Sequence, residues 1–170
     1  RVFLPNSVRY DSPVFSGTRF GVTYSLGSHG RGDTEAARFA RMYGNDGFAL
    51  NVLYDNGQLN LLANVDRLAD SNNLFLWNAG VVFKSGAWKF TLGYEQSTLK
   101  SMEGYMVRGN QKEWLTSVRY VTGPHVWTTT LNRGELHGSP HDGHADKLAV
   151  GYGYDFSRRT QLYANVVCIG

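Results

Sequence analysis

Apolar and polar residues alternate with a period of two along most of this 170-residue chain. In the stretch KLAVGYGYDF (147–156), Leu148 and every second residue after it is apolar or aromatic, whereas the residues of opposite parity are charged or small. Because successive residues of a β-strand point to opposite faces, such a stretch has one apolar and one polar face. The same alternation predicts strands within 6–15, 18–26, 47–54, 58–66, 75–84, 88–95, 114–120, 126–132 and 160–166. The chain is therefore predicted to be all-β, with about ten strands.

The connections between these strands predict antiparallel hairpins in an up-and-down order. Asn-Gly at 56–57 supplies the positive φ of a tight hairpin turn, and Ser-Gly at 85–86 and Gly-Pro at 123–124 are also turn-forming pairs. Short turns are therefore expected at one end of the strands and mostly long loops at the other. The long connections are 27–45, 67–73, 99–112 and 134–146, with a short loop helix expected at 34–43.

Three features of the strands favour a transmembrane β-barrel. Several strands approach roughly 9–11 residues, the length that crosses a hydrocarbon core at a tilt. Their polar parity is rich in Gly, Thr, Asn, Lys and Arg, as a water-filled interior would be. Aromatic residues of the apolar parity lie near strand ends, where membrane barrels carry aromatic girdles. They are Phe20, Tyr54, Phe83, Trp88, Tyr120, Trp127 and Phe156. A soluble β-sandwich or a ligand-binding β-barrel of the lipocalin type, with the two faces exchanged, stays open as the alternative.

Composition argues against several other classes of protein. The charged fraction of 18% lies below the roughly 25% typical of soluble domains, and no apolar run of about 18 residues predicts a transmembrane helix. The single cysteine, Cys168, excludes an internal disulfide framework, and its parity places it on the apolar face. Basic residues are interspersed with acidic ones at a net charge of +3, so no nucleic-acid partner is predicted. The Arg-Gly-Asp tripeptide at 31–33 matches an integrin-binding motif and is attributed to chance.

Two stretches of the chain resemble a known family. NSVRYDSPVFSGTRFGVTYSL (6–26) is similar to the segment that follows the constriction loop in Gram-negative trimeric general-diffusion porins of the β-proteobacterial and neisserial type. YDFSRRTQLYANV (154–166) resembles the stretch of those porins in which a turn leads into the penultimate strand. The resemblance covers essentially the whole chain. It implies an up-and-down antiparallel barrel of sixteen strands in the outer membrane, with periplasmic turns and extracellular loops.

The resemblance also implies a function and partners. It implies a homotrimer, embedded in membrane lipids and lipopolysaccharide, that passes small hydrophilic solutes and ions by passive diffusion. No enzymatic activity and no cofactor are expected. Counted in the family's topology, residues 1–170 form a single β-barrel domain that is expected to be incomplete at both ends. The first five strands and the constriction loop are expected to precede Arg1, and the closing strand is expected to follow Gly170.

Charged residues of the polar parity are the candidate functional residues, because pore width and charged wall residues set the selectivity of a channel. The basic ones are Arg9, Arg19, Lys84, Lys89, Arg119, Lys147 and Arg159, and the acidic ones are Asp11, Asp66, Glu95 and Asp155. In the family a basic ladder on the wall faces acids on the constriction loop, and the resemblance makes Arg9 and Arg119 the best candidates for that ladder. Arg19, Lys84 and Arg159 lie close to turns and are expected at the rim. A weak anion preference is expected; the alternative is that these are ordinary solvated side chains.

One histidine-containing segment offers two other chemistries. His137, His141 and His144 lie near Asp142 and are suitable ligand types for a metal. The glycine-rich segment offers no rigid scaffold and no partner that would orient the rings, so no metal site is predicted. An outer-membrane protease would also place histidine and acidic residues at this rim, as at His137, Asp142 and Asp146. No supporting motif accompanies them, so the chain is predicted not to be an enzyme.

Overall fold

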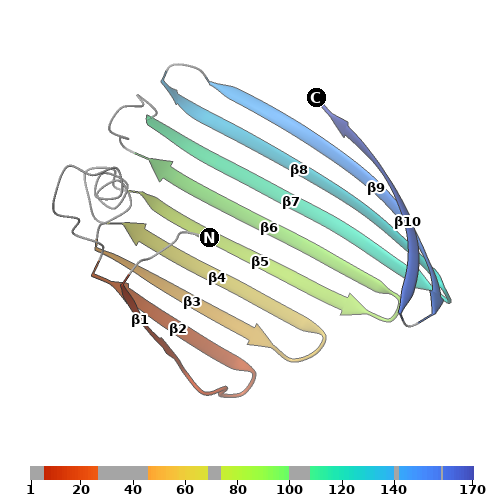
Figure 1. The fold of residues 1–170 in the computed structure, drawn as a ribbon, viewed down its shortest axis with the longest axis horizontal. Helices are drawn as coiled ribbons and strands as arrows, with labels where there is room; N and C mark the ends of the chain where they lie inside the picture. Colours follow the sequence, from red (N-terminus) through yellow and green to blue (C-terminus); the bar gives the residue numbers. More distant parts are fainter. Residues whose placement is uncertain (1–5, 27–45, 69–73, 100–107, 140–141, 158) are drawn as a thin grey trace.

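The computed structural model describes residues 6–26, 46–68, 74–99, 108–139, 142–157 and 159–170. They form one antiparallel sheet in which each strand pairs with the next along the chain, which confirms the predicted all-β, up-and-down order (Figure 1). The strands are β1 (Ser7–Asp11), β2 (Thr18–Ser25), β3 (Gly47–Asp55), β4 (Leu59–Leu68), β5 (Phe75–Ser85), β6 (Trp88–Leu99), β7 (Arg108–Thr122), β8 (His125–Ser139), β9 (Gly143–Ser157) and β10 (Thr160–Ile169). In these ranges no helix has the length and hydropathy needed to cross a membrane. The predicted helix at 34–43 and the tripeptide at 31–33 lie outside the described residues.

The register of the strands carries the alternation of residues across the whole sheet. Residues directly opposite each other in an antiparallel pair share a face. Lys89 lies opposite Lys84 on β5 and Arg119 on β7, whereas the preceding residue, Trp88, lies opposite Tyr120. One face of the sheet therefore collects the polar parity of successive strands, and the other face collects the apolar parity.

Tight turns close the hairpins at one end of the sheet. Gly57, Gly86 and Gly123 have φ angles of 87°, 55° and 56°, in the left-handed region that glycine adopts without strain. In the first of these turns, the side-chain oxygen of Asn56 accepts hydrogen bonds from the backbone N–H groups of Gln58 and Leu59 at 3.1 and 2.7 Å. The turns predicted at 56–57, 85–86 and 123–124 are confirmed.

The long loop predicted at 134–146 is wrong, because β8 continues to Ser139 and β9 begins at Gly143, so that each strand has 15 residues. Similarly, β6 continues to Leu99 and β7 begins at Arg108, inside the loop predicted at 99–112. The added segments carry mainly polar residues and glycine on both faces, so they show little alternation. Backbone hydrogen bonds between strands do not require an apolar face, and the ladder continues through these segments.

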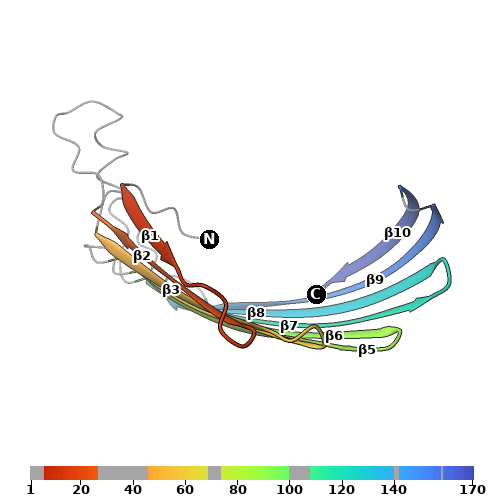
Figure 2. The ribbon, with the colours of Figure 1, turned by 90° about the horizontal axis from the view of Figure 1, so that it is seen from below.

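The sheet is one layer thick and curves into an open trough whose edges in the described part of the chain are β1 and β10 (Figure 2). A hollow of about 820 Å³ lies over the polar parity of β1 to β6. We call this the concave face and the apolar face the convex face. Across the described ranges, Val126 is the one buried hydrophobic side chain, at 7% exposure, whereas Leu92 and Trp127 of the convex face are 51% and 50% exposed. The sheet has no packed apolar layer of its own, and an apolar surface of this size marks a contact with membrane or protein.

Candidate functional site

Arg9 forms an ion pair on the concave face near the β1 edge. Its Nε and Nη2 atoms donate to the two carboxylate oxygens of Asp11 at 2.8 and 2.6 Å, and Nη2 also donates to Asn51 Oδ1 at 3.2 Å. Gly21 leaves room for this cluster, since a Cβ there would lie 2.5 Å from Asn51 Oδ1 and 2.7 Å from Asp11 Oδ1. The positive charge of Arg9 is therefore compensated locally by Asp11. The sequence indicated both charged residues but not their pairing.

A row of polar side chains continues from this cluster across the middle of the concave face. Asn64 Nδ2 donates to Asn78 Oδ1 at 2.8 Å, and Asn78 Nδ2 lies 3.4 Å from Glu95 Oε2. Glu95 lies opposite Glu113 on β7, and the half-buried Asp66 lines the same hollow. The acidic groups of the wall thus gather here. Sequence reasoning missed Asn64, Asn78 and Glu113, although the parity of the strands would have placed all three on the polar face.

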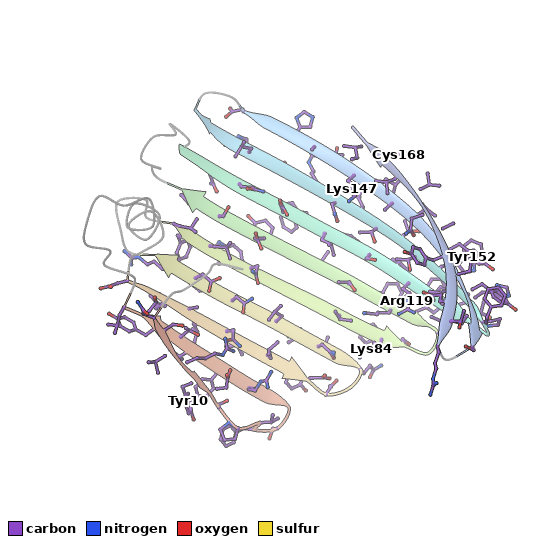
Figure 3. The ribbon with its side chains drawn as sticks, in the orientation of Figure 1. Tyr10, Lys84, Arg119, Lys147, Tyr152 and Cys168 are labelled. Carbon is purple, nitrogen blue, oxygen red and sulfur yellow. The ribbon has the colours of Figure 1, made fainter. Side chains whose placement is uncertain are left out.

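Three basic residues form a second row, close to the turn end of the sheet. Lys84, Lys89 and Arg119 lie directly opposite one another on β5, β6 and β7. Figure 3 labels Lys84 and Arg119 near the turn ends of their strands. Lys89 precedes Glu95 on the same strand by six residues, a distance of about 20 Å along an extended chain. Cations and carboxylates on this part of the concave wall are therefore separated along the strands.

The other predicted residues lie apart from this basic row. Arg19 is on the concave face near the turn end of β2, and Lys147 is on the concave face of β9, opposite Asn132. The carboxylate of Asp155 accepts a hydrogen bond from Gln161 Nε2 at 2.6 Å. Arg159 lies in the turn between β9 and β10 rather than within a strand.

Aromatic residues of the convex face form two belts. The turn-side belt contains the pairs Trp88–Tyr120 and Trp127–Tyr152, with ring centroids 4.4 and 4.6 Å apart. The phenol oxygen of Tyr152 lies 2.8 Å from His125 Nδ1, so its polar end is hydrogen-bonded. Tyrosine and tryptophan, with an apolar body and a polar end, are enriched at membrane interfaces. The turn-side belt therefore has the composition of an interfacial girdle.

The loop-side belt contains Trp77, Tyr94 and Trp114. The ring centroid of Tyr94 lies 4.9 Å from that of Trp77 and 4.3 Å from that of Trp114. Tyr94 follows Trp88 by six residues on β6, which separates the two belts by about 20 Å along the strand. Sequence reasoning named only aromatics at the turn-side ends of strands and missed the loop-side belt, although Trp77, Tyr94 and Trp114 lie within two residues of the loop-side ends of the predicted strands. Cys168 lies on the convex face as its parity predicted, and its thiol is free and exposed.

Three described residues of the histidine-containing segment contact neighbours other than one another. His137 lies on the convex face with Nε2 3.7 Å from Glu135 Oε2. Asp142 accepts a backbone N–H bond at 2.8 Å, and Asp146 lies 3.9 Å from an arginine. Within the described ranges, no group of three or more His, Cys, Asp or Glu residues could hold a metal ion. His141 lies outside these ranges.

Comparison with known proteins supports the same architecture. The family profile of Gram-negative porins matches residues 4–167. Among curated proteins, no sequence matches. The anion-selective porin from Comamonas acidovorans is similar in structure, with a TM-score of 0.75 and 17% identity over 98% of this chain and 49% of that one.

Two further solved structures share the fold. A porin refined at 1.8 Å has a TM-score of 0.69 and 13% identity, covering 95% of this chain and 55% of its own. Salmonella typhi OmpF in complex with daunomycin has a TM-score of 0.71 and 10% identity, covering 95% and 53%. The chain thus spans about half the length of the solved porins it matches.

Proposed function

The chain belongs to the family of Gram-negative porins. From that premise we propose that it forms part of the wall of a water-filled channel in the outer membrane. Small hydrophilic solutes and ions diffuse through the channel down their gradients. The protein then performs no chemical step and uses no cofactor. Membrane lipids and lipopolysaccharide surround the convex face, and the assembly is a homotrimer.

The observation that carries this proposal is the division of one sheet into two opposed surfaces. The concave face presents ion pairs, amides and free cations, whereas the convex face presents exposed leucine, valine and aromatic side chains between two belts. A wall with water on one side and hydrocarbon on the other needs this division. A soluble ligand-binding barrel would instead enclose its apolar side chains.

The two edge strands of the sheet are evidence for a larger barrel. β1 and β10 each pair on one side only in the described part of the chain. Unpaired backbone groups are costly in hydrocarbon, and closure into a barrel removes them. We propose that both edges pair with further strands of the same sixteen-stranded barrel.

We also propose a weak anion preference, which the distribution of charge along the concave wall supports. Arg9 is compensated by Asp11 and contributes a local field rather than net charge. Lys84, Lys89 and Arg119 carry no carboxylate partner among the described residues, so they raise the concentration of anions at their end of the channel. That a porin of this fold is described as anion-selective supports the proposal.

Reversal potentials in planar bilayers test this function. The full-length protein should insert as discrete conductance steps, and a KCl gradient should give a reversal potential on the anion side. Arg119→Gln should move that potential toward cation selectivity, whereas Asn132→Gln, an uncharged exchange on the same face, should not. A protein that gives no conductance steps and is released from membranes by carbonate would be the soluble ligand-binding alternative.

A further inference from the structure

The row of Lys84, Lys89 and Arg119 brings three like charges together on adjacent strands. Lys89 faces Lys84 on one side and Arg119 on the other, in direct cross-strand register. Like charges directly opposite each other destabilise a sheet, whereas opposite charges stabilise it. No described residue forms a salt bridge or a side-chain hydrogen bond with any of the three. The row is therefore an uncompensated concentration of positive charge.

Two other arginines in the described sheet, Arg9 and Arg133, have carboxylate partners. Arg9 is held by Asp11 at 2.6 Å, and Arg133 lies 3.3 Å from Glu135. The carboxylates of the concave wall near the row are displaced toward the loop end, where Glu95 lies six residues beyond Lys89. What distinguishes the row is that three cations without a salt bridge to any described residue lie in direct cross-strand register.

Aromatic side chains pack on the face of the sheet opposite the row. On the opposite face of the same strands, Trp88 packs against Tyr120 with ring centroids 4.4 Å apart, in the turn-side belt. The row therefore lies at the level of a membrane interface and opens toward channel water. Thr128 continues it on β8, directly opposite Arg119, and adds a hydroxyl group.

The spacing of the row matches a multivalent oxyanion. Adjacent strands lie 4.7–4.9 Å apart, so the outermost strands of the row are about 10 Å apart. A guanidinium binds phosphate oxygens with two parallel hydrogen bonds, and lysine ammonium groups neutralise the remaining charge. At this strand spacing a single phosphate has the size to contact two neighbours of the row, and a diphosphate has the length to contact all three.

We propose that Lys84, Lys89 and Arg119 form a binding site for phosphorylated solutes at the turn-side mouth of the channel. This inference rests on the proposed function, because the row must face channel water. The site concentrates phosphate-bearing solutes at this mouth and slows their passage. Because the row lies on the face opposite the hydrocarbon surface, its ligand is a dissolved solute rather than a lipid headgroup.

Block of the ion current by inorganic pyrophosphate tests the site. The full-length channel is inserted into phosphatidylcholine bilayers at low salt, because salt screens exposed charges, and pyrophosphate is added from the turn side. Removal of one charged hydrogen-bonding partner should raise the half-blocking concentration about tenfold. Lys89→Gln and Lys84→Gln should each do so, while electrophoretic mobility of the folded barrel shows that both variants fold.

Lys147→Gln is the matched control, because it removes one cation from the same face but from outside the row. It should shift the potassium-to-chloride preference and leave the half-blocking concentration of pyrophosphate unchanged. Equal effects of Lys147→Gln and Lys89→Gln would overturn the site and leave only general electrostatic attraction. Conducting channels without block would also overturn it while leaving the proposed function intact, whereas a protein without conductance would overturn both.

Bilayers with anionic headgroups separate the two sources of phosphate. A dissolved ligand gives the same ratio of half-blocking concentrations, wild type to Lys89→Gln, in phosphatidylglycerol as in phosphatidylcholine. A headgroup bound to the row would compete with pyrophosphate and abolish that ratio in phosphatidylglycerol, which would contradict a solute site.

Discussion

Replacing one leucine by arginine on each face of the sheet tests which face meets hydrocarbon. Leu92 lies on the convex face of β6 and is 51% exposed, whereas Leu115 lies on the concave face of β7, opposite Gly93, and is 36% exposed. The two positions are on adjacent strands and the substitution is the same. A difference in stability between the two arginine variants therefore reflects the surroundings of each face and not the substitution itself.

The expected magnitudes differ because the two faces have different solvents. Leu92→Arg places a guanidinium between the two aromatic belts, near the middle of the hydrocarbon. A basic side chain there costs about 2–4 kcal/mol, or roughly a 30- to 700-fold fall in the folding equilibrium constant. Leu115→Arg places the same group in channel water beside Gly93, and the free energy of unfolding should fall by no more than about 1 kcal/mol.

Urea unfolding of the full-length channel in lipid vesicles, followed by tryptophan fluorescence, measures both free energies. Leu92→Met keeps an apolar side chain of similar volume and should cost less than about 1.5 kcal/mol, which controls for the loss of leucine. If the convex face met water, the more exposed Leu92 would tolerate arginine at least as well as Leu115. That order of stabilities would refute the assignment of the two faces.

Three further predictions concern single positions. Arg9→Gln leaves Asp11 uncompensated and should shift the reversal potential toward cations, whereas Asp11→Asn should shift it toward anions; shifts of the same sign would contradict the ion pair. Gly17→Ala should lower the free energy of unfolding by about 1–3 kcal/mol more than Gly57→Ala does. Both glycines have positive φ, but a Cβ at Gly17 would lie 2.6 Å from the Asp55 carbonyl oxygen, whereas a Cβ at Gly57 would meet nothing within 4 Å. Urea unfolding measures the free energy lost in each variant, and equal losses would contradict the steric conflict at Gly17. A charged thiol reagent should label Cys168 much more slowly in vesicles than in denaturant, as mass spectrometry would show, since its thiol faces lipid; equal rates would place the thiol in water.

The alternation of residues was sufficient to predict the type of fold and the face of each side chain. It placed Lys89 and Arg119 on one face and Trp88 and Tyr120 on the other, as the register of β6 and β7 confirms. It failed where the signal disappears, as in the extension of β8 to Ser139. There, polar residues and glycine occupy both faces, and only the backbone ladder defines the strand.

The candidate site was predicted as separate residues, and the tertiary structure decided how they combine. The sequence indicated Arg9 as the best ladder residue, but the structure pairs it with Asp11 and Asn51. It assigned Lys84 to the rim, and the structure places it next to the turn, where its neighbour across the strands is Lys89.

Parity is a local property, because neighbouring residues of an extended chain must point to opposite sides. Each strand therefore carries its own division into a polar and an apolar face before it meets any other. Register is not local, because it depends on which backbone groups of two strands pair and on the turn that joins them. The sequence by itself determined which side chains share the polar face, and only the assembled sheet decided which of them are neighbours.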